Sequence, residues 1–138
     1  MKNILVTGAG GYIGTVLVRY LLEKGYLVTA FDRFYFGKEK LPTHKNLVLK
    51  LEDCRNIRES DFSNIDCVID LVAISNDPSG EVFADATMDI NYLARAKTAE
   101  LAKKAGVKRY ILPSSCSIYG FQNNVANEES VTNPLTNY

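Results

Sequence analysis

Short apolar runs separated by polar or glycine-rich stretches recur along the chain. The first run, residues 2–7, is β-branched and does not alternate with polar residues, a pattern typical of a strand buried in a parallel sheet. Similar runs predict strands at 27–31, 47–51, 67–73 and 110–112. Helical patterns lie between them, so the sequence predicts an α/β fold with a doubly wound parallel sheet and helices on both faces.

Two helices are predicted from apolar spacing. Residues 13–24 place Ile13, Val16, Leu17, Tyr20 and Leu21 on one face, which we expect to be buried. A long helix is expected at about 81–105, ended by Gly106. The remaining segments are expected to be a loop or short helix at 34–46, a short polar helix or loop at 55–64, and an active-site loop at 121–138.

A glycine-rich segment joins the first strand to the first helix. Residues 7–14 read TGAGGYIG, with the spacing G-x-x-G-x-x-G. Gly8 is suited to a tight turn, Gly11 to close approach of a pyrophosphate, and Gly14 to close packing of the helix. An ordinary glycine-rich turn is the simpler alternative, but the strand before and the helix after favour dinucleotide binding.

Asp32 ends the second predicted strand, 18 residues after Gly14. An acid roughly 20 residues past the glycines commonly binds a ribose 2′-hydroxyl and repels a 2′-phosphate, which favours NAD over NADP. Arg33 argues the other way, because an arginine can stack on adenine or accept a 2′-phosphate. A turn or capping aspartate is the alternative for Asp32.

Polar or glycine-containing segments follow every predicted strand. Since the carboxyl ends of parallel strands share one edge, we expect residues 8–14, Asp32, Asp53, 73–80 and 114–120 to line that edge. Two further polar residues require partners that the sequence does not name. Asp70 interrupts the fourth strand, and Asn91 lies inside the long helix, where a satisfied core amide is the simpler interpretation.

Composition narrows the class of protein. The 138 residues suit one domain, and 46% of them are hydrophobic. Sixteen basic and sixteen acidic residues balance, so nucleic acid is not an expected partner. The three cysteines lack metal-like spacing and suggest reduced thiols, while the lone His44 has no assigned role. Neither a signal peptide nor a run of ~18 apolar residues is present, so we expect no membrane association and a cytoplasmic location.

Taken in order, these features resemble the extended short-chain dehydrogenase/reductases, specifically the NAD-dependent nucleotide-sugar epimerases and dehydratases, with their Rossmann-like fold. The resemblance covers the whole chain. Its markers are the segment 7–14, Asp32, Asp53, residues 71–73, Asn91, and the segment 114–120, which reads SSCSIYG. Asp70 and Val72 depart from the family, which usually has histidine and alanine there.

The resemblance implies NAD as the cofactor and assigns its contacts. It implies that Gly8, Gly11, Tyr12, Ile13 and Gly14 hold the pyrophosphate, Asp32 and Arg33 the adenosine ribose, and Asp53 and Cys54 the adenine. It places Leu71, Val72, Ala73 and Ser75 along the ribose and nicotinamide, and it includes Pro113 among the cofactor residues. It also implies that Asn91 supports the loop after the fourth strand. No metal site is implied.

The resemblance also implies Ser115 and Tyr138 as catalytic residues. Tyr138 lies 23 residues after Ser115 and matches the tyrosine of a Y-x-x-x-K motif, whose lysine would fall at position 142. A free phenol with a pKa near ~10 is a poor base near neutrality. We therefore expect residues 1–138 to be a truncated, inactive cofactor domain without its C-terminal substrate domain. Cys116 is expected to be a small packing residue rather than a nucleophile.

Two functions are therefore considered. The first is an NAD-dependent oxidoreductase acting on a nucleotide sugar, with oxidation of the C4 type leading to epimerisation, dehydration or reduction. The second is a non-catalytic dinucleotide-binding module or sensor. Members of the family commonly dimerise through helices that include the long one, so the resemblance also implies a homodimer.

Overall fold

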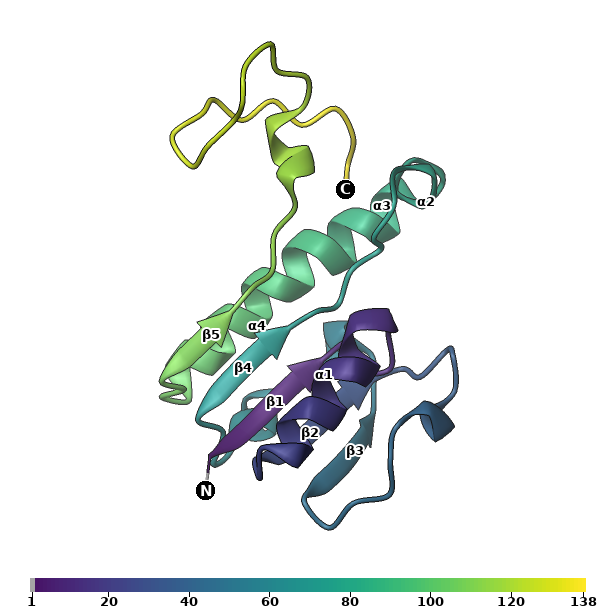
Figure 1. The fold of residues 1–138 in the computed structure, drawn as a ribbon, viewed down its shortest axis with the longest axis vertical. Coiled ribbons are helices and arrows are strands. Elements are labelled where there is room, and N and C mark those ends of the chain that lie inside the picture. Colours follow the sequence, from purple (N-terminus) through teal and green to yellow (C-terminus); the bar gives the residue numbers. More distant parts are fainter. Residues whose placement is uncertain (1) are drawn as a thin grey trace.

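The computed structural model describes residues 2–138, which form a five-stranded sheet flanked by helices (Figure 1). The strands are β1 (Asn3–Thr7), β2 (Leu27–Asp32), β3 (Leu47–Leu51), β4 (Cys67–Asp70) and β5 (Arg109–Ile111). Their order is β3-β2-β1-β4-β5, and every neighbouring pair is parallel. The predicted doubly wound α/β fold is confirmed.

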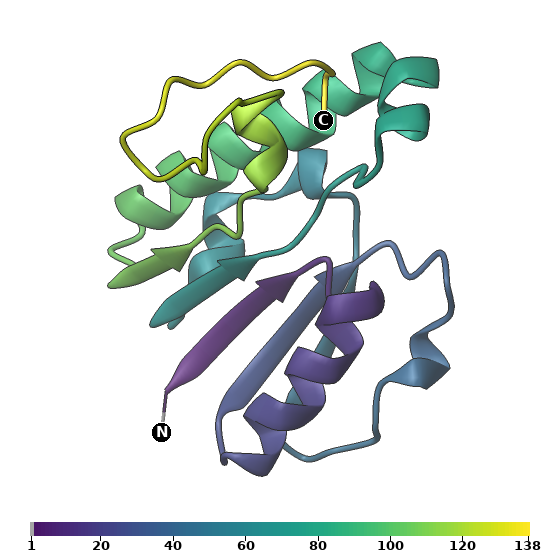
Figure 2. The ribbon, with the colours of Figure 1, turned by 45° about the horizontal axis from the view of Figure 1, so that its top comes forward.

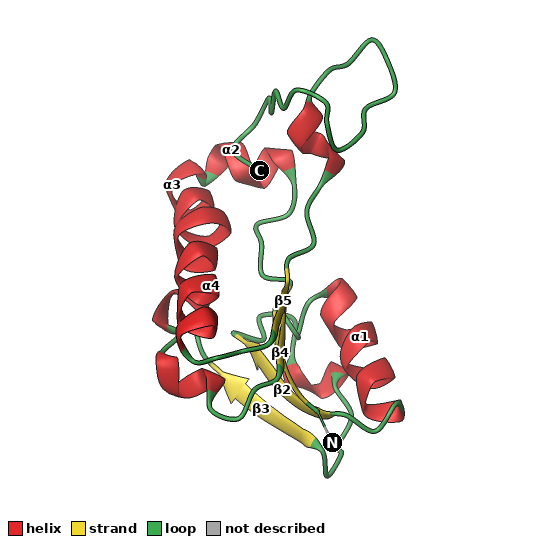
Figure 3. Cartoon of the chain, turned by 90° about the vertical axis from the view of Figure 1, so that its left-hand side faces the viewer, coloured by secondary structure: helices red, strands yellow, loops and turns green. Residues whose placement is uncertain are grey.

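Helices cover both faces of the sheet. The α-helices are α1 (Tyr12–Glu23), α2 (Asp77–Val82), α3 (Ala84–Thr87) and α4 (Arg95–Lys104), and a π-helical segment, η4 (Met88–Ala94), joins the last two. Short 3-10 turns occupy η1 (Lys38–Lys40), η2 (Cys54–Asn56), η3 (Glu59–Phe62) and η5 (Cys116–Tyr119). Figure 3 shows α1 on one side of the sheet and α4 on the other. No helix within residues 2–138 is long and apolar enough to cross a membrane.

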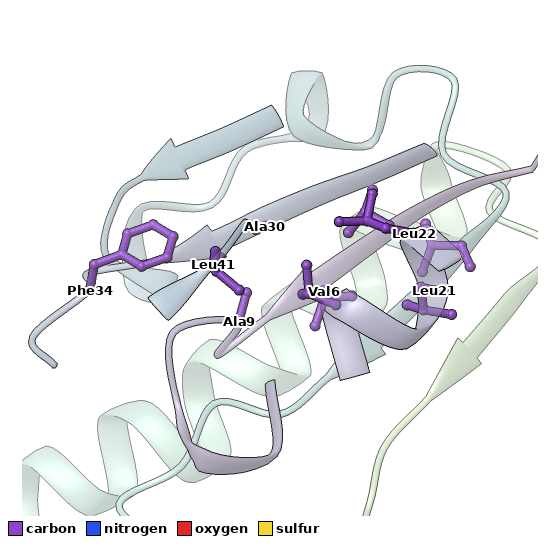
Figure 4. Packing of buried hydrophobic residues seen from close by; sticks show 10 residues of the cluster. Val6, Ala9, Leu21, Leu22, Ala30, Phe34 and Leu41 are labelled. Carbon is purple, nitrogen blue, oxygen red and sulfur yellow. The ribbon is translucent and has the colours of Figure 1, made fainter. Parts of the chain in front are cut away.

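The sheet carries a separate apolar cluster on each face. Alternation along β1 sends Ile4 and Val6 toward α1, where they pack with Val18, Leu21 and Leu22 (Figure 4). Leu5 points to the other face and joins a second cluster, whose other buried members are Phe31, Ile57, Phe62, Val68 and Ala102. These two layers fix the sheet from both sides and hold its carboxyl edge in place.

The buried face of α1 agrees only in part with the prediction: Leu21 is buried and Leu17 packs against the same cluster, as expected. Ile13, Val16 and Tyr20 are exposed, whereas the buried residues are Gly14, Val18, Leu21 and Leu22. Apolar residues lie almost all around this helix, so periodicity did not define one face. The helix is oriented instead by Gly14, whose lack of a side chain lets α1 lie directly on the loop before it.

Two other boundaries are corrected. The strand predicted at 67–73 is shorter in the structure. Its pairing with β1 extends from Cys67 to Asp70 and ends there. The predicted long helix begins earlier, at Asp77, and is interrupted at Phe83, whose φ of −117° and ψ of 48° are not helical. It continues through the π-helical η4 into α4, and Gly106, with φ +77°, follows its end as expected.

The chain after β5 extends beyond the carboxyl ends of the strands and returns toward α2 (Figures 1 and 2). Thr136 donates a hydrogen bond to Asp77 at the start of α2, at 2.7 Å. This places residues 112–138 at the same edge as the glycine-rich segment.

Candidate functional site

The glycine-rich turn after β1 depends on two glycines. Gly8 has φ +66°, and a Cβ there would lie 2.8 Å from the backbone of Leu71 and Val72. A Cβ on Gly14 would lie 2.2 Å from the carbonyl oxygen of Gly8. Both glycines are therefore required by close backbone approach. The tight turn predicted at Gly8 is confirmed, and Gly14 packs α1 against the turn rather than against the strand itself.

The N-terminus of α1 faces this turn without a capping side chain. Gly11 is the N-cap residue, no side chain among residues 2–138 caps it, and the first turn of the helix has no acidic residue. The side chains of Tyr12 and Ile13 are 93% and 62% exposed. Backbone N–H groups at a helix start carry a partial positive charge and suit a phosphate, so these residues fit the pyrophosphate position predicted for them.

Asp32, at the end of β2, lies against the glycine-rich turn. Its carboxylate accepts hydrogen bonds from the backbone N–H of Gly10 at 3.0 Å and from that of Phe34 at 2.6 Å. The second bond holds Phe34 at φ +52°, with its ring buried in the α1-side cluster. The capping alternative for Asp32 is thus partly correct, because the side chain shapes its own loop as well as facing the candidate site.

The end of β3 carries an ion-pair cluster formed by Asp53, Arg33 and Arg55. Asp53 accepts hydrogen bonds from the Arg55 guanidinium at 3.0 and 2.7 Å and from Arg33 at 3.1 Å. The bonds from Arg55 are the main reason that the pKa of Asp53 falls to about 2. A depression of about 370 Å³ lies here, lined by Arg33, Leu51, Glu52, Asp53 and Asn56. Of the two residues predicted to hold the adenine, Asp53 lines this depression and Cys54 is its neighbour in the chain.

The cysteines differ in exposure. Burial raises the pKa of Cys54, next to this depression, to about 11, and it also raises the pKa of Cys67. Cys116 is exposed. A thiol with a raised pKa is a poor nucleophile, so Cys54 is suited to backbone contact with a ligand rather than to chemistry.

The segment after β4 is held by Asn91. Its side chain accepts a hydrogen bond from the backbone N–H of Ile74 at 2.9 Å and donates one to the Ile74 carbonyl at 3.0 Å. The N–H of Leu71 bonds to the Thr7 carbonyl at 3.2 Å. The predicted support of this loop by Asn91 is present in the structure. Ala73 and Ser75 are exposed at the edge, while Leu71 and Val72 are half-buried beside Gly8.

Asp70 has the partners that the sequence did not reveal. Its buried carboxylate accepts hydrogen bonds from the hydroxyls of Thr7 and Tyr110, and the Nε of Arg95 lies 3.7 Å away. Arg95 also donates to the Asp70 carbonyl at 2.5 Å. Burial, with the hydrogen bond to Asp70, raises the pKa of Tyr110 well above its ordinary value. Arg95 stands four residues after Asn91, a spacing that could have indicated one helix face turned toward the β4 exit.

The two predicted catalytic residues are held by different elements. Ser115 caps η5, its hydroxyl oxygen accepting a bond from the N–H of Ser117 at 3.2 Å, and Pro113 is exposed just before it. Tyr138 lies beside Gly80 of α2, where a Cβ on the glycine would be 3.5 Å from the Tyr138 Cβ. Within residues 2–138 no hydrogen bond joins Ser115 to Tyr138.

The model of the NAD dependent epimerase/dehydratase family matches residues 4–138. Among curated proteins, a 3-beta-hydroxysteroid dehydrogenase of Mycolicibacterium neoaurum is 29% identical to this chain. The alignment covers 95% of this chain and 37% of that protein. The NAD dependence of this family agrees with the cofactor predicted from the sequence.

Solved structures match over the same range. A UDP-N-acetylglucosamine 4-epimerase from Methanobrevibacter ruminantium M1 superposes with a TM-score of 0.93 at 30% identity, over 99% of this chain and 46% of that one. A UDP-glucuronic acid 4-epimerase from Bacillus cereus, in complex with UDP-glucuronic acid and NAD, gives 0.88 at 26% identity, over 98% and 47%. The chain thus spans under half the length of these solved neighbours and about a third of the curated relative.

Proposed function

Because the chain belongs to the NAD dependent epimerase/dehydratase family, we propose that residues 4–138 bind NAD along the carboxyl edge of the sheet, as the cofactor portion of a nucleotide-sugar oxidoreductase. The observation that carries the proposal is the uncapped start of α1 beside Asp32. The turn of residues 8–14 therefore brings a helix N-terminus suited to a phosphate close to an acid suited to a ribose.

Each part of the edge suits one part of the cofactor. The pyrophosphate lies at Gly11, Tyr12 and Ile13, at the start of α1, where no side chain of the described residues caps the helix. The adenosine lies between Asp32 and the depression beside Asp53 and Cys54. The nicotinamide side runs along the exit of β4, which Asn91 fixes through Ile74. The ligand therefore crosses the edge from β3 to β4, over the amino end of α1.

The proposed chemistry uses Ser115 and Tyr138. Ser115 donates a hydrogen bond to the hydroxyl oxygen on the sugar C4, and Tyr138, in its phenolate form, accepts the proton of that hydroxyl as C4 is oxidised. NAD, when bound, accepts a hydride. The nucleotide-sugar class is supported by the solved neighbours, which are epimerases of UDP-sugars. The family description covers epimerases and dehydratases, and a UDP-glucuronic acid decarboxylase is also among the relatives, so the reaction subtype is left open.

A non-catalytic dinucleotide-binding module is the second candidate. It is supported by the separate positions of the two predicted catalytic residues, since the Ser115 hydroxyl is bonded within η5 whereas Tyr138 lies beside Gly80 of α2. The coding sequence after Tyr138 distinguishes the two. A lysine four residues on, followed by a further domain, supports the enzyme, and a stop codon at position 139 supports the module.

We further propose a cytoplasmic location and a homodimer. The described cysteines are all free thiols, as expected in a reducing compartment. Phe83, Tyr92 and Leu93 expose apolar side chains along the α3–η4 segment, a surface suited to a second copy. Light scattering on the purified protein tests the dimer, and a monomer at micromolar concentration would contradict it.

Calorimetric titration tests the binding proposal. We expect the 138-residue chain to bind NAD weakly, to prefer it to NADP, and to show no turnover of UDP-sugars. Absence of binding heat with either cofactor, in a sample shown by circular dichroism to be folded, would contradict the proposal. Activity of the longest encoded protein against a panel of nucleotide sugars, followed by NADH absorbance and product analysis, then identifies the substrate.

A further inference from the structure

Arg33 presents the one feature of the candidate site that opposes NAD selectivity. It directly follows Asp32, at the position from which an arginine can accept the 2′-phosphate of NADP. Its side chain is 44% exposed, so burial alone does not keep it from a ligand. What it contacts therefore decides whether its charge is available to a phosphate.

The Arg33 guanidinium is already engaged on two sides. One nitrogen donates to Asp53 at 3.1 Å, and the guanidinium carbon lies 4.4 Å from the centre of the Tyr35 ring, as a cation–π contact. Arg55 is engaged by the same carboxylate, through bonds of 3.0 and 2.7 Å. The very low pKa of Asp53, caused first by the Arg55 bonds, keeps this carboxylate ionised at any physiological pH.

We propose that Asp53 determines cofactor selectivity, by holding Arg33 away from the ribose 2′ position and offsetting its charge. This inference rests on the proposed binding of NAD at this edge. Asp32 and Asp53 then act together: Asp32 supplies a negative charge beside the ribose, and Asp53 prevents the neighbouring guanidinium from cancelling it. Glu52 lines the same depression, but its carboxylate accepts hydrogen bonds from Asn56 at 3.1 Å and from the Asp53 N–H at 3.0 Å. The bonds from Arg33 and Arg55 go to Asp53 instead.

The inference is tested by measuring NAD and NADP affinities of the wild type and of Asp53→Asn. Asparagine keeps an acceptor oxygen for the Arg55 N–H that caps η2, so the turn is retained. Loss of the Asp53 charge releases the Arg33 guanidinium, so the NAD-to-NADP affinity ratio should shift toward NADP by about fivefold or more at low salt, and by less at ~0.5 M salt. Circular dichroism verifies the fold of each variant.

Two further variants make the result specific. Glu23→Gln removes the same charge at the far end of α1, at the opposite edge of the sheet, and should leave the ratio unchanged. Arg33→Ala/Asp53→Asn should lose the gain, because the freed guanidinium is then absent. A ratio that Asp53→Asn leaves unchanged, or a gain that persists without Arg33, would overturn the inference while leaving NAD binding intact. Failure of the folded wild type to bind NAD would instead contradict the proposed function, and this inference with it.

Discussion

The carboxylate of Asp32 accepts a hydrogen bond from the backbone N–H of Gly10 at 3.0 Å, which ties the end of β2 to the turn between β1 and α1. The acid therefore has two roles. It shapes the turn that precedes the helix start, and it places a negative charge where a ribose is proposed to bind. This pairing leads to the first prediction.

Replacing Asp32 should change cofactor preference. Asp32→Ala is expected to weaken NAD by about tenfold, equivalent to ~1.4 kcal/mol, and NADP by less, since the repulsion of a 2′-phosphate is also removed. Asp32→Asn keeps an acceptor oxygen for Gly10 while removing the charge, so it separates the two roles. An NAD-to-NADP ratio unchanged in both variants, measured by calorimetry, would count against Asp32 as the selecting acid.

Gly8→Ala should destabilise the fold more than an equally left-handed glycine elsewhere. The left-handed backbone alone costs roughly 1–2 kcal/mol, and the added Cβ would meet Leu71 and Val72 at 2.8 Å. Gly25→Ala is the matched control, since Gly25 has φ +81° and an added Cβ there would meet none of the described residues beyond its chain neighbours within 4 Å. Urea unfolding should show a loss in free energy of unfolding for Gly8→Ala about 1–2 kcal/mol larger than for the control. Equal losses would contradict the close approach.

The two hydrogen bonds from Asn91 to Ile74 should stabilise the segment that follows β4. Asn91→Leu removes both bonds to Ile74 and leaves a part-buried N–H and carbonyl unpaired, at a cost of about 1–3 kcal/mol. Asn91→Asp retains an acceptor for the Ile74 N–H but sets a carboxylate oxygen against the Ile74 carbonyl, so it should also destabilise the fold at neutral pH. NAD affinity is expected to fall in both variants. Wild-type stability and affinity in Asn91→Leu would show that the contact is not needed.

The burial of Tyr110, together with its bond to Asp70, should make stability fall at alkaline pH. The pKa of Tyr110 is raised in the folded protein, so the folded state keeps its proton after the unfolded state has lost it. This contribution is fully present below pH ~10, the unfolded pKa, and declines at up to ~1.4 kcal/mol per pH unit above it. The difference in free energy of unfolding between wild type and Tyr110→Phe should therefore shrink from pH 9 to pH 11. A constant difference would exclude this linkage.

The sequence predicted the sheet and its carboxyl edge well, because these depend on local patterns. The run at 47–51 forms β3 with the same bounds, Gly8 and Asp53 follow β1 and β3, and Asp32 ends β2, as expected. Contacts between distant segments were not predictable in the same way. The partners of Asp70 come from β1, β5 and α4, and only the fold brings Thr7, Tyr110 and Arg95 together.

Helix faces and breaks were the other failures. In α1 the turn at Gly8 and Gly14 sets the rotation of the helix, while Ile13, Val16 and Tyr20 supplied an apolar stripe that proved exposed. In the second helical region the helix is interrupted at Phe83, and Asn91, within the π-helical η4, bonds to Ile74 in the segment after β4. Helical periodicity carries no information on either feature.

The most direct measurement is an NMR titration of the ¹⁵N-labelled chain with NAD. Binding at the start of α1 predicts shifts of the backbone amide signals of Gly11, Tyr12 and Ile13, and of Cys54 beside the adenosine depression. Lys24 and Gly25, at the other end of α1, should stay unchanged. Shifts confined to other surfaces, or none in a folded sample at millimolar NAD, would contradict the binding of NAD at this edge.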